Sequence, residues 1–317
     1  MDGRAAHSDS KRRGLVLAVL EYASPTTVRP KVDYPLSVKE ALQVAWDRPY
    51  QDPCKVLDYV AEVINGLFDE WHNDMGQLAA WTMVLQSSGW GKSRTMRELA
   101  TKGFYVVYVS FLKIGSTGIP DRSAVAQQLI SSKMSNDPHA VAAWVLAILT
   151  QIKEKSPEEW MKEQSEPHFG EPVAKSYLKL RGEVLEEVRV SKPGPGQDWD
   201  GVKLTHWIRK TANKTFVPDK KIIVCMDKVS SWFGQVAGSF LTCRRFFSCI
   251  PRNLKVFGLV ADTAGKLGLV IPPQMQERSS SSTRFFEPIW VVGSLWWDFE
   301  QAKKLMSLQL KKGSDQP

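Results

Sequence analysis

The sequence lacks any apolar run long enough to cross a membrane. Among its 317 residues, none of the apolar segments reaches the roughly 18 residues that a membrane span requires. The apolar segment 14–20 follows Lys11, Arg12 and Arg13, as in a short signal peptide, but it stops at Glu21. We interpret it as a buried strand or helix, and we expect no membrane partner.

Cysteine and histidine are scarce and are not spaced as ligands. The four cysteines show no disulfide framework, and the five histidines show no metal-ligand spacing. Cys225 lies within an apolar strand pattern, which favours a buried thiol. These observations argue against zinc chemistry and Cys–His catalysis. They predict an intracellular, reducing compartment, with cytoplasm and nucleus both open.

The chain also lacks a strong cluster of charge. Its formal net charge is +8 and its pI is about 9.2, but the basic residues are spread along the sequence. A solvated basic surface explains this spread, and a nucleic-acid partner would rest on the net charge alone.

The order of predicted elements indicates an α/β domain with a mostly parallel sheet. Strand patterns alternate with helical ones, which is typical of a sheet covered by helices. The predicted strands occupy 79–86, 104–109, 221–227 and 254–262, and a helical insertion occupies about 121–210. We assign 1–33 to an N-terminal tail that is partly disordered, 34–300 to the domain and 301–317 to a C-terminal helix and tail.

The segment 81–95 has the order strand, polar loop, helix. An apolar run ends at Leu85, and Gly-Lys-Ser then opens a helical pattern. Backbone N–H groups in such a loop, with the positive end of the helix, bind phosphate groups. Lys92 would reach the β- and γ-phosphates, and the Ser93 hydroxyl would bind Mg²⁺. The candidate nucleotide-binding residues in this loop are Ser88, Gly89, Trp90, Gly91, Lys92, Ser93 and Arg94.

This loop departs from the full phosphate-loop pattern, which has glycine six positions before the lysine. Gln86 stands there instead, and bulky Trp90 separates the two remaining glycines. The simpler alternative is a glycine-rich turn before an ordinary helix with an exposed lysine.

A phosphate loop needs a second strand that ends in a carboxylate. The apolar strand 222–226 is followed by Asp227, which would hold Mg²⁺ at the carboxyl edge of the sheet. The strand 256–261 ends in Asp262 and Thr263, where Thr263 would sense the γ-phosphate. The sequence leaves open whether Asp227 or Asp262 is the Mg²⁺ carboxylate. A solvated residue at the end of a strand is the structural alternative for each.

Together these blocks resemble the P-loop NTPase domain of Crinkler-type proteins from fungi and oomycetes. The resemblance covers about 35–300 and rests on the motifs at 85–94, 118–121, 222–227, 257–266 and 272–273. It implies a three-layer P-loop NTPase fold and an ATPase related to AAA+ and signal-transduction ATPases. In the additional-strand class of these proteins, the sensor strand lies beside the aspartate strand. Lys92, Asp227 and Thr263 can meet one phosphate only if their strands lie side by side with their carboxyl ends at the same edge. For this reason we predict 79–86 at the centre of the sheet, flanked by 255–262 and 221–227, with 104–109 beyond the latter.

The chain differs from this family at three points. Lys228 follows Asp227 where hydrolysing relatives have the glutamate base, and a cation cannot accept the proton. Asp262 and Thr263 replace the usual Ser-Thr pair, and only about 20 residues follow Asp298 where AAA+ proteins add a helical lid.

The leading hypothesis is ATP and Mg²⁺ binding with hydrolysis weak or lost, so that an ATPase activity stays undecided. The alternative is a degenerate NTPase fold that serves as a protein-interaction module without nucleotide chemistry. Arg244 and Arg245 are candidate trans-acting arginines in a homo-oligomer, although basic residues on a solvated helix face explain them more simply. No residue identifies a protein partner.

Overall fold

The described part of the chain forms two compact units, and the candidate site lies in the larger one. The computed structural model describes residues 38–50, 52, 55–74, 76–86, 91–116, 119–131, 137–152, 154–166, 168–189, 201–215, 220–233, 239–263, 286 and 288–290. The smaller unit, Met1–Tyr50 with Leu112–Asp121, contains helix α2 (Val38–Asp47). The larger unit comprises Gln51–Phe111 and Arg122–Pro317. The predicted tail at 1–33 and the predicted C-terminal helix lie outside the described residues.

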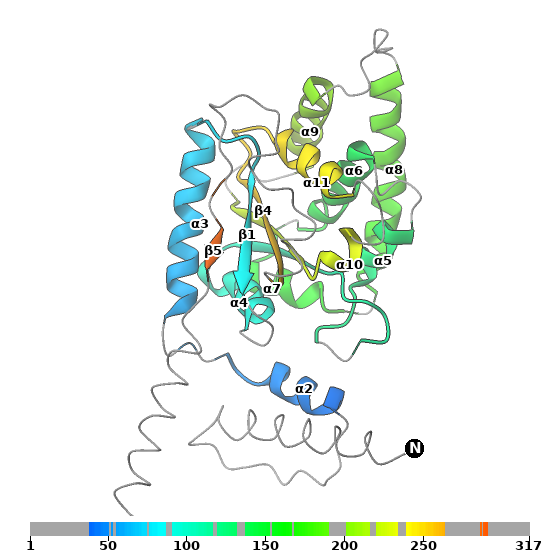
Figure 1. Cartoon of the computed structure of the whole chain (residues 1–317). Coiled ribbons are helices and arrows are strands. Elements are labelled where there is room, and N and C mark those ends of the chain that lie inside the picture. The colour runs from blue at the N-terminus through cyan, green and yellow to red at the C-terminus, as the bar shows by residue number, and fades with distance from the viewer. Residues whose placement is uncertain are drawn as a thin grey trace, which may run out of the picture. The chain divides into compact units, whose positions relative to one another are not determined.

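The larger unit is built on a parallel sheet, which confirms the predicted α/β class. Its strand order is β2-β3-β4-β1-β5, and every neighbouring pair is parallel. Figure 1 labels β1, β4 and β5 of this sheet. The strands are β1 (Trp81–Gln86), β2 (Tyr105–Ser110), β3 (Ile222–Asp227), β4 (Val256–Thr263) and β5 (Ile289–Trp290). Apolar, β-branched runs such as Val106–Val109 favour this arrangement because both faces of the sheet are buried.

The central strand is β4, so the prediction that 79–86 lies at the centre is wrong. β4 pairs with β1 on one side and with β3 on the other. The predicted pairing of β3 with β2 is confirmed, and β2 forms one edge of the sheet. Neighbouring strands lie about 4.8 Å apart, and only β4 separates β1 from β3. The ends of β1 and β3 are therefore close enough to contribute to one site.

Helix α3 (Val56–His72) packs on one face of the sheet. The Asp52 carboxylate accepts hydrogen bonds from the backbone N–H groups of Val56 and Leu57, at 2.8 and 2.7 Å, and thereby caps the helix. The Phe68 ring packs against the Phe257 ring of β4 in a tilted arrangement, with ring centroids 5.7 Å apart. The apolar residues of this helix recur at helical spacing, and they form the surface that it buries.

Helix α11 (Ser239–Ser248) packs on the opposite face of the sheet. Positions 257 and 258 face opposite sides of β4, and α3 contacts the first while α11 contacts the second. Phe247 lies directly over Gly258, and a Cβ atom there would come within 2.4 Å of its ring. Glycine in the middle of this strand therefore allows the close approach of the helix. Figure 1 shows α3 on one side of the strands and α11 on the other.

Among the described residues, five helices lie between β2 and β3, in the stretch where the sequence predicts a helical insertion. They are α5 (Ala124–Ser131), α6 (Pro138–Leu149), α7 (Pro157–Glu163), α8 (Gly170–Arg189) and α9 (Gly201–Thr215). These helices span 124–215, so the segment begins and ends a few residues later than the predicted 121–210. α6 packs against α8, α9 and α11, which explains why almost all of its side chains are apolar and buried.

Helix α7 protects the open edge of β2. The Gln164 side chain at its end accepts a hydrogen bond from the Tyr108 backbone N–H, at 2.9 Å, and donates one to the Val106 carbonyl, at 2.6 Å. The Trp160 indole also donates to Val106, at 2.9 Å. These contacts occupy backbone groups that would otherwise template strand addition.

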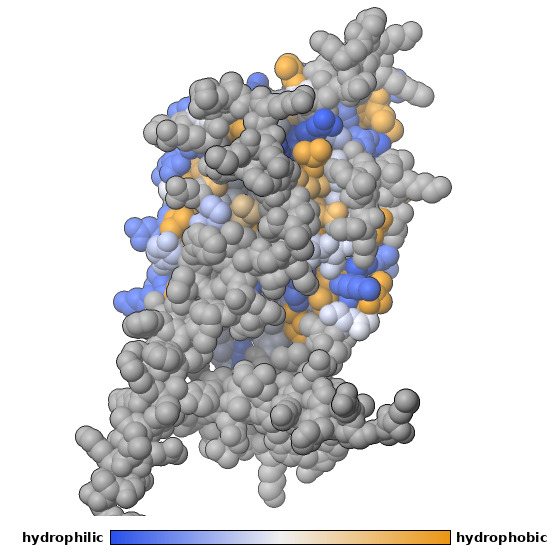
Figure 2. All heavy atoms as spheres, viewed as in Figure 1, coloured by the Kyte–Doolittle hydropathy of each residue, from blue (hydrophilic) through white to orange (hydrophobic). Residues whose placement is uncertain are grey.

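Two further findings concern the surface and the thiols. No helix among the described residues is long and apolar enough to cross a membrane. Among the coloured residues in Figure 2, apolar and hydrophilic side chains are interspersed on the face in view.

Cys225 is fully buried in β3, which confirms the predicted buried thiol.

Candidate functional site

The candidate site lies at the carboxyl edge of the sheet, where β1, β3 and β4 end together. Leu85 of β1 is level with Asp262 of β4, and Asp227 of β3 is level with Ala261. Parallel strands in register therefore bring polar residues that are far apart in sequence to one edge.

Ser93 and Asp227 meet directly at this edge. The Ser93 hydroxyl donates a hydrogen bond of 2.5 Å to Asp227 Oδ2, across 134 positions of sequence. Helix α4 (Lys92–Glu98) carries Ser93 in its first turn, and Gly91 precedes the helix in the left-handed conformation, with φ of 79°. That conformation favours glycine, so Gly91 sets the direction in which the helix starts.

Tyr108 is a site residue that the sequence analysis missed. Its hydroxyl donates to Asp227 Oδ2 at 2.6 Å, so that one carboxylate oxygen accepts two short bonds. Tyr108 is paired with Cys225, two residues before Asp227 and on the same face of the sheet. The pairing of β2 with β3 would have been the signal, but register between distant strands cannot be read from a single sequence.

Burial sets the ionisation of the two central groups. Only 1% of Asp227 is exposed, and desolvation raises its pKa, against the opposing effects of the Lys228 charge and the hydrogen bonds from Ser93 and Tyr108. Lys92 is 7% exposed, and desolvation lowers its pKa. The negative charges of Asp227 and Asp262 favour the ammonium form of Lys92. The site thus holds a buried cation beside two acidic side chains.

Lys228 and Asp262 shape the rim of the site. Lys228 has a φ of 57°, which is uncommon for a non-glycine residue, and its N–H donates to the Ala261 carbonyl at 2.8 Å. Asp262 Oδ2 accepts a bond of 2.8 Å from the Ser230 N–H, at the start of α10 (Ser230–Phe233). The Ser93 bond therefore goes to Asp227, while Asp262 holds the turn that follows β3.

Several predicted residues are not placed at this cluster. Ser88, Gly89 and Trp90 lie outside the described residues, as does the side chain of Thr263, the last residue of β4. Arg94 forms an ion pair with Glu98 one turn along α4, at 2.6 Å. Arg244 and Arg245 lie on α11, which packs on a face of the sheet. Gly91, Lys92, Ser93 and Asp227 are the predicted residues that the structure describes at the carboxyl edge.

The donor set at this edge consists of hard oxygen atoms. In the part of the chain that the structure describes, no group of three or more His, Cys, Asp and Glu residues is arranged to hold a metal ion. A hydroxyl and one carboxylate are nevertheless the protein ligands that Mg²⁺ takes when phosphates and water complete its shell. The Ser93–Asp227 pair fits this chemistry.

Comparison with known proteins places the chain in a family without assigning it an activity. Residues 52–288 match a family described as a domain of unknown function, DUF8735. The chain belongs to this family. The match includes the sheet from β1 to β4 and the carboxyl-edge cluster, together with Trp71 and Arg252 at the opposite edge. Neither a curated protein nor a solved structure is significantly similar to the chain.

Proposed function

We propose that this domain binds a nucleoside triphosphate, with ATP as the leading candidate, together with Mg²⁺, and that it hydrolyses the nucleotide slowly or not at all. The observation that carries the proposal is the 2.5 Å bond from Ser93 to Asp227. It joins the start of the helix after β1 to the end of β3. A site shared between a phosphate loop and a strand carboxylate requires this juxtaposition.

The electrostatics at the edge support the same proposal. Lys92 is largely desolvated, so its ammonium group would interact more strongly with phosphate oxygens than an exposed lysine would. Phosphates are multiply charged, and they would favour the ammonium form of Lys92 as Asp227 and Asp262 do. A buried cation next to a strand edge is expensive for a purely structural site.

Mg²⁺ would be held by Ser93 and Asp227, and it would offset the negative charge of the bound phosphates. Tyr108 would keep the Asp227 carboxylate oriented towards Ser93, since its hydroxyl already bonds the same oxygen atom at 2.6 Å. Asp227 must ionise to bind the cation, and burial opposes this ionisation. The bonds from Ser93 and Tyr108 stabilise the ionised form.

The strand order also supports a three-layer P-loop fold. β4, which ends in Thr263, lies beside β3, which ends in Asp227. This is the arrangement that the resemblance implies for the additional-strand class. Helices on both faces of a parallel sheet supply the other two layers of such a fold.

Slow hydrolysis is proposed because of Lys228. A general base must accept a proton from the attacking water, and the residue after Asp227 is a cation that cannot do so. The Lys228 charge acts on both Asp227 and Lys92, which locates it at this edge. The domain would therefore retain a bound nucleotide rather than turn it over.

The Mg²⁺ dependence of ATP affinity tests the proposed metal pair. We expect the parent protein to bind ATP more tightly in Mg²⁺ than in EDTA. Ser93→Ala and Asp227→Asn should each reduce this difference by about tenfold or more, the value of a bond to a charged group. Ser248→Ala is the matched control, because its hydroxyl lies at the end of α11 and donates to the Arg245 carbonyl. ATP binding of equal strength in Mg²⁺ and EDTA would contradict the metal site, and an absence of ATP binding would favour the interaction module.

A further inference from the structure

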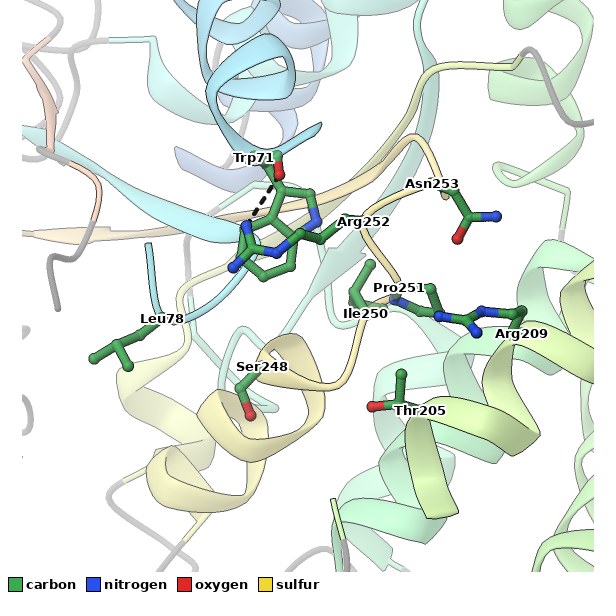
Figure 3. Close-up of a pocket in the computed structure, with 9 residues that line it drawn as sticks. All are labelled: Trp71, Leu78, Thr205, Arg209, Ser248, Ile250, Pro251, Arg252 and Asn253. Atoms are coloured by element: carbon green, nitrogen blue, oxygen red, sulfur yellow. Dashed lines mark hydrogen bonds between the residues drawn. The ribbon is translucent and has the colours of Figure 1, made fainter. Parts of the chain in front are cut away.

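A second site lies at the opposite, amino edge of the sheet. A pocket of about 610 Å³ opens there between the end of α3, the segment before β1, one face of α9 and the turn between α11 and β4 (Figure 3). Its size falls within the range of small-molecule pockets, about 300–1,000 Å³. The carboxyl-edge cluster contributes no residue to it.

Arg252 builds one wall of the pocket and holds it in place. Its guanidinium donates to the backbone carbonyls of Trp71 and Gln77, at 3.0 and 3.2 Å, and pairs with Asp74 at 2.6 Å. The same group lies over the Trp71 ring, 4.1 Å from its centroid. The end of α3 and the approach to β1 are thus fastened to the start of β4, and the orientation of the Trp71 ring is fixed.

Trp71 presents a buried polar group to the pocket. The residue is only 3% exposed, and its indole Nε1 has no hydrogen-bond partner among the described residues. In Figure 3 this ring nitrogen lies on the side of the ring that faces the rest of the lining. A buried N–H group without an acceptor costs about 1–3 kcal/mol. A ligand atom that accepts a hydrogen bond would remove this cost.

Arg209 supplies a charge to the same pocket. Its guanidinium extends from α9 towards Pro251 in Figure 3, and it makes no hydrogen bond or ion pair with any residue that the structure describes. None of the described residues that line the pocket is acidic. Asn253 adds an amide that can donate or accept. The polar groups of the pocket therefore favour an anion over a cation.

The rest of the wall is apolar. Ile250 and Pro251 are buried residues of the turn before β4, and Leu78 closes the side next to β1. Water or a small inorganic anion would leave this apolar surface poorly covered. An organic body would cover it and would gain about 25 cal/mol for each Å² that it buries.

We propose that this pocket binds a small organic carboxylate, whose apolar body lies against Ile250, Pro251 and Leu78. One carboxylate oxygen accepts from Trp71 Nε1, and the group pairs with the Arg209 guanidinium. Arginine and carboxylate groups match in planar geometry and form charge-assisted bonds. The site is independent of the nucleotide site, because the two lie at opposite edges of the sheet.

The indole N–H signals of the intact protein report directly on this site. Tryptophan can be labelled with ¹⁵N at the indole nitrogen, and the Trp71 signal can be assigned among the 12 tryptophans with Trp71→Phe. The probes are sodium benzoate, neutral benzyl alcohol of similar shape, and sodium sulfate. We expect benzoate to shift the Trp71 signal saturably, and the alcohol and sulfate to shift it at least tenfold more weakly. Failure of benzoate to produce a saturable shift would overturn the proposal, as would an equal response to the alcohol or to sulfate.

A matched pair of variants tests the role of the Arg209 charge. Calorimetry with the same probes measures their affinities and needs no assignment of NMR signals. Arg209→Gln should weaken benzoate binding about tenfold or more. Arg245→Gln removes an exposed arginine outside the pocket and should leave the affinity unchanged. Lys92→Ala should also leave benzoate binding unchanged, whether or not the chain binds ATP. Equal affinity in Arg209→Gln and the parent would overturn the proposal.

Discussion

The two edges of one sheet differ in how they treat buried charge. At the carboxyl edge, Lys92, Asp227 and Asp262 are buried together. Desolvation lowers the pKa of Lys92 and raises the pKa of Asp227, so it favours the neutral form of each side chain. At the amino edge, the cation Arg252 is only partly buried, and it pairs with two carbonyls and an exposed aspartate. The first arrangement is costly for the protein alone, and the second stabilises it.

This difference separates the proposed binding site from a structural clamp. The bonds of the Arg252 guanidinium join the turn before β4 to the end of α3 and to the segment before β1. The hydroxyls of Ser93 and Tyr108 instead converge on one buried carboxylate, which belongs to the proposed Mg²⁺ site. Groups held at a cost by a rigid scaffold are typical of functional sites. Substitutions at the carboxyl edge should therefore change nucleotide binding or turnover as well as stability, whereas substitutions of the amino-edge clamp should change stability alone.

The largest expected effect is a gain of ATP turnover in Lys228→Glu. This change places a carboxylate where the site has a cation, and a general base contributes about 10²–10⁴-fold to a rate. Steady-state phosphate release measures it. Lys228→Ala is the control, since it removes the cation without adding a base and should gain far less. Rapid hydrolysis by the parent protein would show that the base lies elsewhere.

A pair of tyrosines on β2 gives the next effect. Tyr108→Phe removes a donor to the buried Asp227 carboxylate, and the free energy of unfolding near neutral pH should fall by about 1.5–3 kcal/mol. Tyr105→Phe removes a bond of 2.8 Å to the Lys155 carbonyl and should cost only about 0.5–1.5 kcal/mol. Denaturant unfolding measures both. Equal losses would mean that the bond to Asp227 has no special weight.

The pH dependence of Tyr108→Phe follows from the sign of the Asp227 shift. The folded pKa of Asp227 is raised, so protonated Asp227 adds stability below its unfolded pKa, and this stability is lost as pH rises through the folded pKa. Tyr108→Phe removes a bond that favours the ionised form and raises the pKa further. The loss of stability in this variant should therefore grow from acidic to neutral pH, whereas the loss in Tyr105→Phe should stay constant.

The smallest effect is expected at the clamp. Arg252→Lys keeps the charge but cannot hold both backbone carbonyls in the same planar geometry, which should cost about 1 kcal/mol of unfolding free energy. ATP affinity should not change, because the clamp lies at the amino edge. Arg245→Lys, at an exposed position of α11, should change neither quantity. A loss of ATP affinity in Arg252→Lys would show that the two edges are coupled.

The sequence predicted the elements and the pair that meets at the carboxyl edge. Short apolar runs before Asp227 and Asp262 predicted parallel strands with polar ends, and strand, loop and Gly-Lys-Ser predicted the position of Ser93. These are local patterns, and the common edge follows from the parallel direction of the strands. The burial of α6 also follows from its sequence, because its residues are apolar on every side.

The rest depended on tertiary contacts. The central position of β4 needs the close approach of Phe247 to Gly258, and a lone glycine in a strand does not reveal its partner. The role of Tyr108 needs the register of β2 against β3. The amino-edge pocket joins Trp71, Arg209 and Arg252 from three distant segments, and no spacing in the sequence links them.

The central claim, that the carboxyl edge binds nucleotide phosphates, is tested most directly by ATP affinity in a matched pair of lysine variants. Lys92→Met removes the buried ammonium group at the start of α4. Lys102→Met removes an exposed ammonium group in the short helix that follows α4, where Lys102 pairs with Asp58 of α3. With Mg²⁺ present, the account predicts a loss of about ten- to a hundredfold in Lys92→Met, without unfolding, and no loss in Lys102→Met. Equal affinity in the parent and both variants, or no ATP binding by the parent, would contradict it.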